Sequence, residues 1–431
     1  MDFYSYKNDE LYCEDVKISK LASGFGTPLY IYSLTTLVRH FEVIRRAFGN
    51  KNHLICYSAK ANTNIAVLKA INLLGGGVDV VSGGELRIAI KAGVNPRKIV
   101  FSGVGKSDDE IKLALESGIL FISAESLQEL ESIARIAGKL KTVADVAVRV
   151  NPDIDPRTHP HIATGLKNTK FGLGESEAKK AYHYIETNKW LNAVGISMHI
   201  GSQVAYVEPY IDSVKKIIGL YRYLQKRNLP LKYIDIGGGW AAYFRPGDRI
   251  PLPADYITAL SGLLKNLDST VIVEPGRSLI GNAGALVMRV IAVKKSGRKS
   301  FCIVDAGMND FIRPVLYNAN HRIVPVRKNE LEKITYDVVG PLCESGDYLS
   351  KGLKMSVVER GDYLVLHTAG AYGFSMASNY NSRPRPAEIL VAGEKAIVMR
   401  DRESINDIIR NQKSAGITSG IINDIKHKIK F

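Results

Sequence analysis

The sequence predicts an α/β fold in which a (β/α)8 TIM-like barrel is joined to a mainly antiparallel β domain, a β-barrel or β-sandwich. From about residue 34 to 276, short β-rich apolar runs alternate with helical patterns. There are eight such runs, the number of strands that a closed parallel barrel needs. An open, doubly wound sheet is the competing architecture. The runs lie at residues 53–58, 78–82, 99–102, 120–123, 146–150, 195–200, 233–236 and 271–273.

The segments between these runs have the spacing of helices. Residues 63–74 and 125–137, for example, place apolar side chains at helical intervals. The second segment begins with Glu125, and an acidic residue in the first turn interacts favourably with the helix dipole. We therefore expect helices between the strands of the barrel.

The pattern changes after residue 277. Strand-like runs at 287–293, 301–304, 336–339, 363–367 and 389–391 are separated by turn signals, and few helical patterns intervene. Such a pattern is typical of antiparallel sheets. The first thirty residues, with a strand expected at 12–18, are predicted to join this part. The predicted domains are thus 34–276 for the barrel, and 1–33 with 277–431 for the β domain.

Composition excludes several classes of protein. The 431 residues are 45% hydrophobic and 23% charged, with a formal net charge of +15. The lysines are scattered, so we interpret the charge as surface composition and expect no nucleic-acid partner. The four cysteines Cys13, Cys56, Cys302 and Cys343 form no CxxC pair, which argues against disulfides and against a zinc or other metal site.

The location expected from the sequence is the cytoplasm. The N-terminus carries acidic residues where a signal peptide needs an apolar core, and no segment reaches the roughly 18 apolar residues of a membrane span. Residues 421–431 are basic and weakly amphipathic. Contact with a membrane or a partner helix is possible for such a segment, but we expect it to pack locally or to fray.

Four polar motifs follow strands one, six, seven and eight of the predicted barrel. They contain Lys60, His199, Gly237-Gly238-Gly239 and Glu274-Pro275-Gly276-Arg277. In a barrel these strand ends meet at one mouth, and phosphate usually lies after strands seven and eight. The positions of these motifs favour the barrel over the open sheet.

The four motifs together suit pyridoxal phosphate, an aldehyde with a phosphate and a pyridine nitrogen. A desolvated Lys60, with a lowered pKa, would form a Schiff base; a solvated lysine is the plain alternative. The glycine run and Gly276 expose backbone N–H groups to the phosphate, to which Ser202 could add its hydroxyl. Glu274 suits the pyridine nitrogen, or else a structural ion pair with Arg277. His199 either stacks on the ring or is an ordinary core histidine.

Cys343-Glu344-Ser345 ends a strand of the β domain. A thiol beside a carboxylate could donate a proton and bind an amine. A small buried hydrophobic residue is the more common role of a free cysteine.

With these motifs the chain resembles the diaminopimelate decarboxylases, which belong to the alanine-racemase-like, fold-type III pyridoxal-phosphate enzymes. The resemblance extends from about residue 10 to 410. Its most specific segments are TGLKNTKFG at 164–172, DAGMND at 305–310, RPVLY at 313–317, GPLCES at 340–345 and GAYGFSMASNYN at 370–381. Ser58-Ala59 before Lys60, and the tail after about residue 411, depart from the family pattern.

The resemblance implies an activity and an assembly. The activity is the decarboxylation of meso-2,6-diaminopimelate to L-lysine and CO2, the last step of lysine biosynthesis. The assembly is a homodimer with shared active sites, in which the Cys-Glu pair comes from the second subunit.

The resemblance also implies roles for single residues. Lys60 would form the Schiff base, His199 would stack on the ring and Glu274 would pair with the pyridine nitrogen. The implied phosphate-region contacts are Gly239, Gly276 and Ser202. The distal carboxylate of the substrate would be bound by Arg277, Arg313 and Tyr317, and its ammonium by Glu344. Cys343 would donate the final proton, although Lys60 is an alternative donor, and Tyr372 would touch cofactor and substrate.

The substrate argument also has a physical basis. Two arginines facing ornithine or arginine would be buried without a carboxylate, at a cost of several kcal/mol. A racemase of the same fold would need a second base, commonly a tyrosine. A catalytically inactive binding protein could lose Lys60 or Cys343, and both are present.

Overall fold

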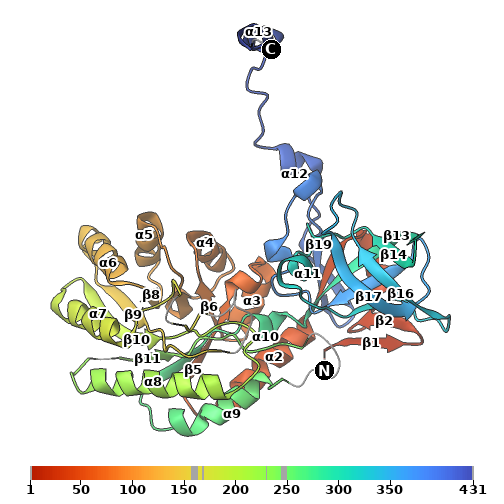
Figure 1. Ribbon diagram of the computed structural model, residues 1–431. Coiled ribbons are helices and arrows are strands. Elements are labelled where there is room, and N and C mark those ends of the chain that lie inside the picture. Colours follow the sequence, from red (N-terminus) through yellow and green to blue (C-terminus); the bar gives the residue numbers. More distant parts are fainter. Residues whose placement is uncertain (1, 157–163, 167–168, 230, 244–249, 430–431) are drawn as a thin grey trace.

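The computed structural model describes residues 2–156, 164–166, 169–229, 231–243 and 250–429. Figure 1 shows two parts side by side: a barrel surrounded by helices on the left, and a β domain on the right that includes strands from both ends of the chain. Residues 167 and 168 of the segment 164–172 lie outside the described residues. Among the residues described, no helix is both long enough and apolar enough to span a bilayer.

The barrel is closed and all eight of its strands are parallel. This confirms the predicted fold, and each strand lies within a few residues of its expected position. The sheet closes where β12 pairs with β5, with Val271 opposite His53. The strands are β5 (His53–Ser58), β6 (Gly77–Val80), β7 (Ile99–Phe101), β8 (Phe121–Ala124), β9 (Ala144–Arg149), β10 (Leu191–Ser197), β11 (Tyr233–Asp235) and β12 (Thr270–Val273).

Helices surround the barrel and bury their apolar faces against it. They are α2 (Leu34–Ala47), α3 (Ile65–Leu73), α4 (Gly83–Lys91), α5 (Asp108–Glu116), α6 (Leu127–Leu140), α7 (Glu175–Thr187), α8 (Glu208–Gln225), α9 (Pro253–Leu264) and the short α10 (Arg277–Ile280). One detail of the prediction is wrong. Glu125 does not open α6, because Ser126 is the N-cap and accepts the Glu129 N–H. Glu125 instead forms a buried ion pair with Arg149 at 2.6 Å.

The β domain is built on one nine-stranded sheet. Most of its pairs are antiparallel, as predicted, and two pairs are parallel: β14 with β16, and β19 with β4. The long β13 pairs with β4, β14 and β18 and so connects the sheet. The strands are β4 (Leu29–Ser33), β13 (Gly284–Ser296), β14 (Lys299–Val304), β15 (Ile323–Pro325), β16 (Lys333–Val339), β17 (Tyr348–Ser356), β18 (Tyr363–His367), β19 (Ala387–Ala392) and β20 (Lys395–Arg400).

The N-terminal segment differs from the prediction. In place of one strand over 12–18, a hairpin of β2 (Glu10–Cys13) and β3 (Val16–Lys17) turns at Glu14, whose φ is 53°. Then α1 (Ile18–Phe25) begins. With β1 (Tyr4–Lys7) this hairpin forms a separate three-stranded sheet, and only β4 enters the large one. The division of the chain into independent domains at residues 33 and 277 stays a prediction.

A buried hydrogen-bond network fixes the β domain to the segment that follows β5. Glu388 of β19 is fully buried and accepts hydrogen bonds from Tyr32 Oη at 2.7 Å and Asn64 Nδ2 at 2.9 Å. Arg400 Nε donates to the same carboxylate at 2.7 Å, and Asn62 Nδ2 donates to Tyr32 Oη at 3.0 Å. Fully satisfied buried networks of this kind are rigid. The network therefore holds one edge of the barrel mouth in place.

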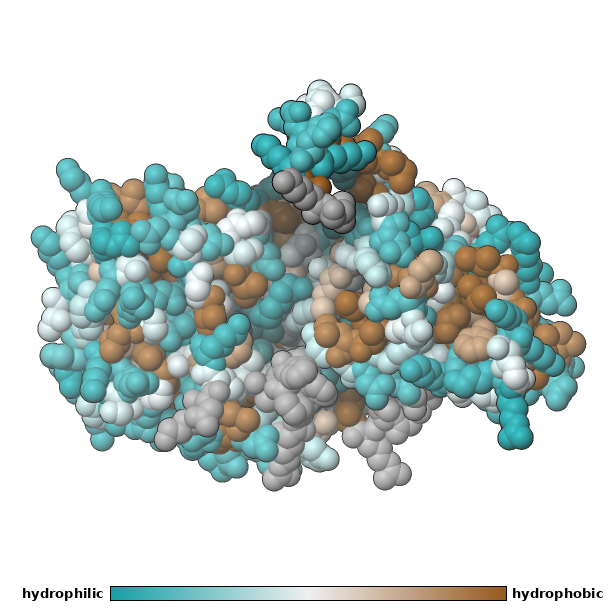
Figure 2. Space-filling model, turned by 45° about the horizontal axis from the view of Figure 1, so that its top comes forward, coloured by the Kyte–Doolittle hydropathy of each residue, from teal (hydrophilic) through white to brown (hydrophobic). Residues whose placement is uncertain are grey.

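The C-terminal helices α12 (Ile405–Ile409) and α13 (Ser419–Lys428) extend away from both parts (Figure 1). Neither helix has a buried residue. Of the two expectations for residues 421–431, local packing is therefore not found for the described residues of the single chain, and the frayed tail stays a prediction. On the face shown in Figure 2, hydrophobic surface is more extensive over the β domain, on the right, than over the barrel.

Candidate active site

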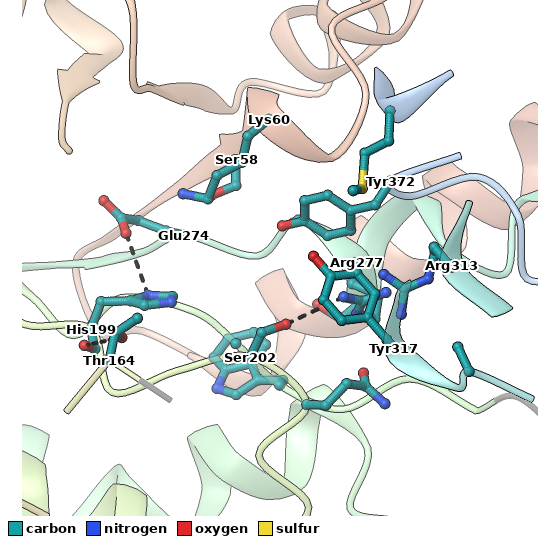
Figure 3. A pocket seen from close by; sticks show the side chains of 17 residues that line it. Ser58, Lys60, Thr164, His199, Ser202, Glu274, Arg277, Arg313, Tyr317 and Tyr372 are labelled. Carbon is teal, nitrogen blue, oxygen red and sulfur yellow. Dashed lines mark hydrogen bonds and ion pairs between the residues drawn. The ribbon is translucent and has the colours of Figure 1, made fainter. Parts of the chain in front are cut away.

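A cavity of about 390 Å³ lies at the mouth of the barrel, within the range of about 300–1,000 Å³ that is usual for small-molecule sites. Both parts of the chain line it. The barrel supplies Ser58, Lys60, Thr164, His199, Ser202, Gln203, Gly239, Trp240, Glu274, Gly276, Arg277 and Ser278; the β domain supplies Arg313, Tyr317, Ala319, Tyr372 and Met376. Figure 3 shows Lys60, Glu274 and His199 at one end of the cavity and Arg277, Arg313 and Tyr317 at the other.

The structure brings together ten of the twelve predicted site residues. They are Lys60, His199, Ser202, Gly239, Glu274, Gly276, Arg277, Arg313, Tyr317 and Tyr372. Cys343 and Glu344 do not line the cavity of their own chain, and both are exposed. Cys343 is therefore not the small buried residue that a free cysteine commonly is, whereas Cys13, Cys56 and Cys302 are buried.

Lys60 lies in a single 3-10 turn that follows β5, and its side chain points into the cavity (Figure 3). Its Nζ donates to Asp79 Oδ2 at 3.0 Å, and Ser58 Oγ donates to the same oxygen at 2.7 Å. Burial alone lowers the pKa of Lys60, but the charges of Asp79, Tyr372 and Glu274 outweigh it and raise that pKa above its ordinary value. The expected lowering of the pKa by desolvation is therefore wrong for the cofactor-free chain.

Glu274 follows β12 and is 5% exposed. Its Oε1 accepts a hydrogen bond from Ser102 Oγ at 3.2 Å, and its Oε2 lies 3.9 Å from His199 Nδ1. Burial, and then the charges of Asp235 and Asp79, raise its pKa. Its neighbours are thus hydroxyl, carboxyl and imidazole groups, and among the described residues the alternative ion pair with Arg277 is not formed.

His199 is neutral in this setting. Burial, and then the charges of Lys60 and Arg149, hold its pKa well below the ordinary value. The Gly238 N–H donates to Nδ1 at 3.2 Å, which assigns the ring proton to Nε2. The contact with Glu274 is therefore not an ion pair, and a flat neutral ring faces the cavity.

The glycine run contributes less to the cradle than expected. The Gly237 N–H donates to Asp235 Oδ1 at 2.8 Å and the Gly238 N–H donates to His199, so neither is available to an anion. Gly239 and Gly276 line the cavity, and their N–H groups have no hydrogen-bond partner among the described residues. Gly239 has φ of 90°, and a Cβ there would lie 1.8 Å from the Gly201 carbonyl oxygen, so only glycine fits.

This set of groups fits pyridoxal phosphate. An amine, a carboxylate and a neutral imidazole converge at one end of the cavity. Backbone N–H groups at Gly239 and Gly276, with the hydroxyl of Ser202, provide donors of the kind that bind phosphate oxygens. A second cavity of about 350 Å³ is also lined by Lys60, His199 and Glu274, so there is room between these groups for a ring.

Two buried arginines define the opposite end of the cavity. Arg277 is 7% exposed and Arg313 6% exposed; their guanidinium groups stack on Tyr372 at 4.7 Å and Tyr317 at 5.3 Å. Burial, and then the charge of Arg277, lower the pKa of Arg313 to about 9. No carboxylate among the described residues pairs with Arg313, and its Nε has no hydrogen-bond partner there. The arrangement attracts an anionic ligand group.

Sequence reasoning missed Asp79, Ser102, Ser58 and Thr164. Asp79 is fully buried and is the partner of Lys60; Ser102 contacts Glu274. A signal was present for the first two, because each is a polar residue within or directly after an apolar strand, where a side chain needs a specific partner. No such signal marks Thr164, whose hydroxyl donates to the His199 carbonyl at 3.0 Å.

Comparison with known proteins gives the class and then the family. Residues 34–281 match the family model described as "Pyridoxal-dependent decarboxylase, pyridoxal binding domain". The fold and the site thus define a pyridoxal-dependent decarboxylase, and pyridoxal phosphate is confirmed as the cofactor. The chain is 47% identical over 407 residues to diaminopimelate decarboxylase of Aquifex aeolicus, covering 94% of this chain and 96% of that protein. It is 45% identical over 410 residues to that of Haemophilus influenzae, covering 95% and 98%.

Solved structures agree with the sequence comparison. Diaminopimelate decarboxylase from Helicobacter pylori, complexed with L-lysine, has a TM-score of 0.88 and 41% identity, covering 91% of this chain and 98% of that one. The M. jannaschii enzyme in complex with L-lysine has a TM-score of 0.91 and 35% identity, covering 97% and 99%. The chain belongs to the diaminopimelate decarboxylase family, which is a family of carboxy-lyases.

Proposed function

We propose that this protein decarboxylates meso-2,6-diaminopimelate to L-lysine and CO2, the last step of lysine biosynthesis, in the cytoplasm. One observation carries the proposal: two buried arginines face Lys60 and Glu274 across a single cavity. A substrate with an amino-acid head at each end suits this arrangement. The L-lysine in the complexes of two relatives is the product expected of that reaction.

The residues at the Lys60 end would hold the cofactor and control protons around it. When bound, pyridoxal phosphate supplies an aldehyde that condenses with amines and a ring that accepts the electron pair released as CO2 leaves. Lys60 provides the amine that attaches it. Glu274 holds a proton at the ring nitrogen, and the neutral His199 covers one face of the ring. Gly239, Gly276 and Ser202 bind the phosphate.

The residues at the other end would select the substrate. Arg277 and Arg313 bind its distal carboxylate, with Tyr317 beside them and Tyr372 between substrate and cofactor. Guanidinium groups can hold a carboxylate by paired hydrogen bonds. A substrate without that carboxylate would leave the Arg313 charge buried and unsatisfied, which costs several kcal/mol. The site therefore favours diaminopimelate over ornithine, arginine or lysine.

The remaining two residues would act in the partner subunit of a homodimer. Cys343 and Glu344 are exposed in the single chain. Tyr380 donates a hydrogen bond to Glu344, which raises the pKa of Tyr380, so these two side chains lie together at the surface. Leu316, between the two ends of the short helix α11 (Arg313–Tyr317), is 45% exposed, and Tyr380 is 47% exposed. An exposed apolar rim beside the site suits a symmetric interface. There Glu344 would bind the distal ammonium, and Cys343 would give a proton to the substrate carbon.

A direct assay tests the activity. The purified protein, supplied with pyridoxal phosphate and meso-diaminopimelate, is expected to release CO2 and L-lysine in equal amounts. L-Lysine and L-ornithine, offered at the same concentration, should release at least about 100-fold less CO2, because neither supplies a distal carboxylate. Equal turnover of L-lysine would contradict the proposed substrate.

A mixing experiment tests the shared sites. We expect Lys60→Ala and Cys343→Ala dimers to be inactive or nearly so by themselves. Co-expressed with two different tags, the variants should form heterodimers with one intact site, and random assortment should restore about one quarter of the wild-type sites. If each site lies within a single chain, no heterodimer contains an intact site, and activity will stay at the level of the separate variants.

A further inference from the structure

The mechanism proposed above leaves one buried carboxyl group unused. Asp235 is the last residue of β11, in which no residue is exposed, and its own exposure is 1%. Its Oδ1 accepts the Gly237 N–H at 2.8 Å. Its Oδ2 is fully buried and finds no N–H or O–H donor among the described residues. An ionised carboxylate held in this way would be strongly destabilised.

The side-chain partner of Asp235 is another carboxyl group. Asp235 and Glu274 follow each other at the ends of the neighbouring strands β11 and β12, and their side chains are hydrogen-bonded. Two ionised carboxylates offer only acceptors, so a hydrogen bond between them requires a proton on one. One proton held between the two carboxyl groups therefore explains both the missing donor at Asp235 and the contact with Glu274.

The surrounding charges do not neutralise this pair. Lys60 is bound to Asp79, and Arg149 is bound to Glu125 at 2.6 Å. Three other titratable side chains face the pair: Cys56, His199 and Tyr210. Burial raises the pKa of Cys56 and of Tyr210 and lowers that of His199, so all three are neutral near pH 7. Among the described residues no group of His, Cys, Asp or Glu is arranged to hold a metal ion, so a proton is the remaining counter-charge.

We propose that Asp235 and Glu274 share a single proton, and that Asp235 is a positioning residue that orients the Glu274 carboxyl toward the cofactor ring nitrogen. The inference rests on the proposed function, in which Glu274 meets that nitrogen. In the cofactor-free protein the proton lies mainly on Glu274, whose O–H donates to Asp235, and the Gly237 N–H stabilises the charge of Asp235. Burial raises the pKa of Asp235 to about 7, and the hydrogen bonds that Asp235 accepts from Glu274 and Gly237 oppose that rise, as expected for the acceptor of the pair.

Infrared spectroscopy of the holoenzyme tests the shared proton. The wild type should show the carbonyl band of a protonated, buried carboxyl group near pH 6. Asp235→Asn, which removes the charge that holds the proton on Glu274, and Glu274→Gln should each remove one protonated carboxyl per subunit. Because the proton is common to both groups, the double variant should remove no more than either single variant. The exposed Asp268→Asn is the matched control and should leave the band unchanged.

The pH dependence of folding gives a second measurement. A carboxyl whose pKa is raised in the folded state stabilises that state most at low pH, and the contribution is lost as pH rises from about 4 to 7. The cofactor-free wild type should lose stability over this interval, and Asp235→Asn should lose less. A band that persists in Asp235→Asn, or in Glu274→Gln should the first variant not fold, would overturn the shared proton. An absence of bound-cofactor absorbance in the wild type would instead overturn the proposed function.

Discussion

Replacing Lys60 with alanine is expected to abolish the visible absorbance of covalently attached cofactor and to lower kcat by about 10³-fold or more, on the scale of losses for other nucleophile deletions. Alanine removes both the reactive amine and its fixed position in the cavity. Lys60 supplies an amine among the groups that line the cavity, and Asp79, at 3.0 Å, holds it in place. Absorbance spectra and CO2 release, measured on the same preparation, check the prediction.

The matched control is Lys69→Ala, an exposed lysine on α3 in the same part of the barrel. It should keep both the absorbance and the turnover. The unfolding midpoint of Lys60→Ala should fall below that of the cofactor-free wild type, because the fully buried Asp79 loses its charged partner, so both preparations are compared below that midpoint. Retained turnover in Lys60→Ala would show that another amine attaches the cofactor.

The barrel was predictable because its signals are local. Each of the eight strands is a short apolar run, and each motif follows such a run, so counting runs and noting their ends was enough. In contrast, β15 has only three residues and ends in a proline, and β17 contains a glycine and exposed polar positions; both strands were missed. Their stability comes from pairing with β18 and β16, which lie elsewhere in the sequence. A single-sequence pattern cannot contain that information.

The site could be predicted as a set of residues but not as a set of charges. The presence of Lys60, Glu274 and the arginines followed from the motifs. The raised pKa of Lys60 depends on Asp79, which β6 brings to the adjacent position in the barrel. The use of the Gly238 N–H by His199 depends likewise on the approach of two strand ends. Such effects arise from distances of a few ångströms between distant segments, and these distances become known only with the fold.

Replacing Arg313 with alanine is expected to raise the KM for meso-diaminopimelate by about 30- to 1,000-fold, with a smaller change in kcat. This range corresponds to the loss of about 2–4 kcal/mol from a charged, buried contact. Arg313→Lys should give an intermediate value, because lysine keeps the charge but not the paired donors. Steady-state kinetics check the prediction, and Arg360→Ala, at an exposed position, serves as the control.

The same substitution separates a binding role from a structural one. Arg313 is buried next to Arg277, and these two effects lower its pKa to about 9, so its charge opposes folding in the absence of substrate. Arg313→Ala should therefore leave the free energy of unfolding of the cofactor-free protein unchanged or raise it, although substrate affinity falls. A large loss of stability with an unchanged KM would assign Arg313 to the core of the β domain and remove it from the substrate site. Because a structural arginine and a substrate-binding arginine move the two measurements in opposite directions, one variant decides between them.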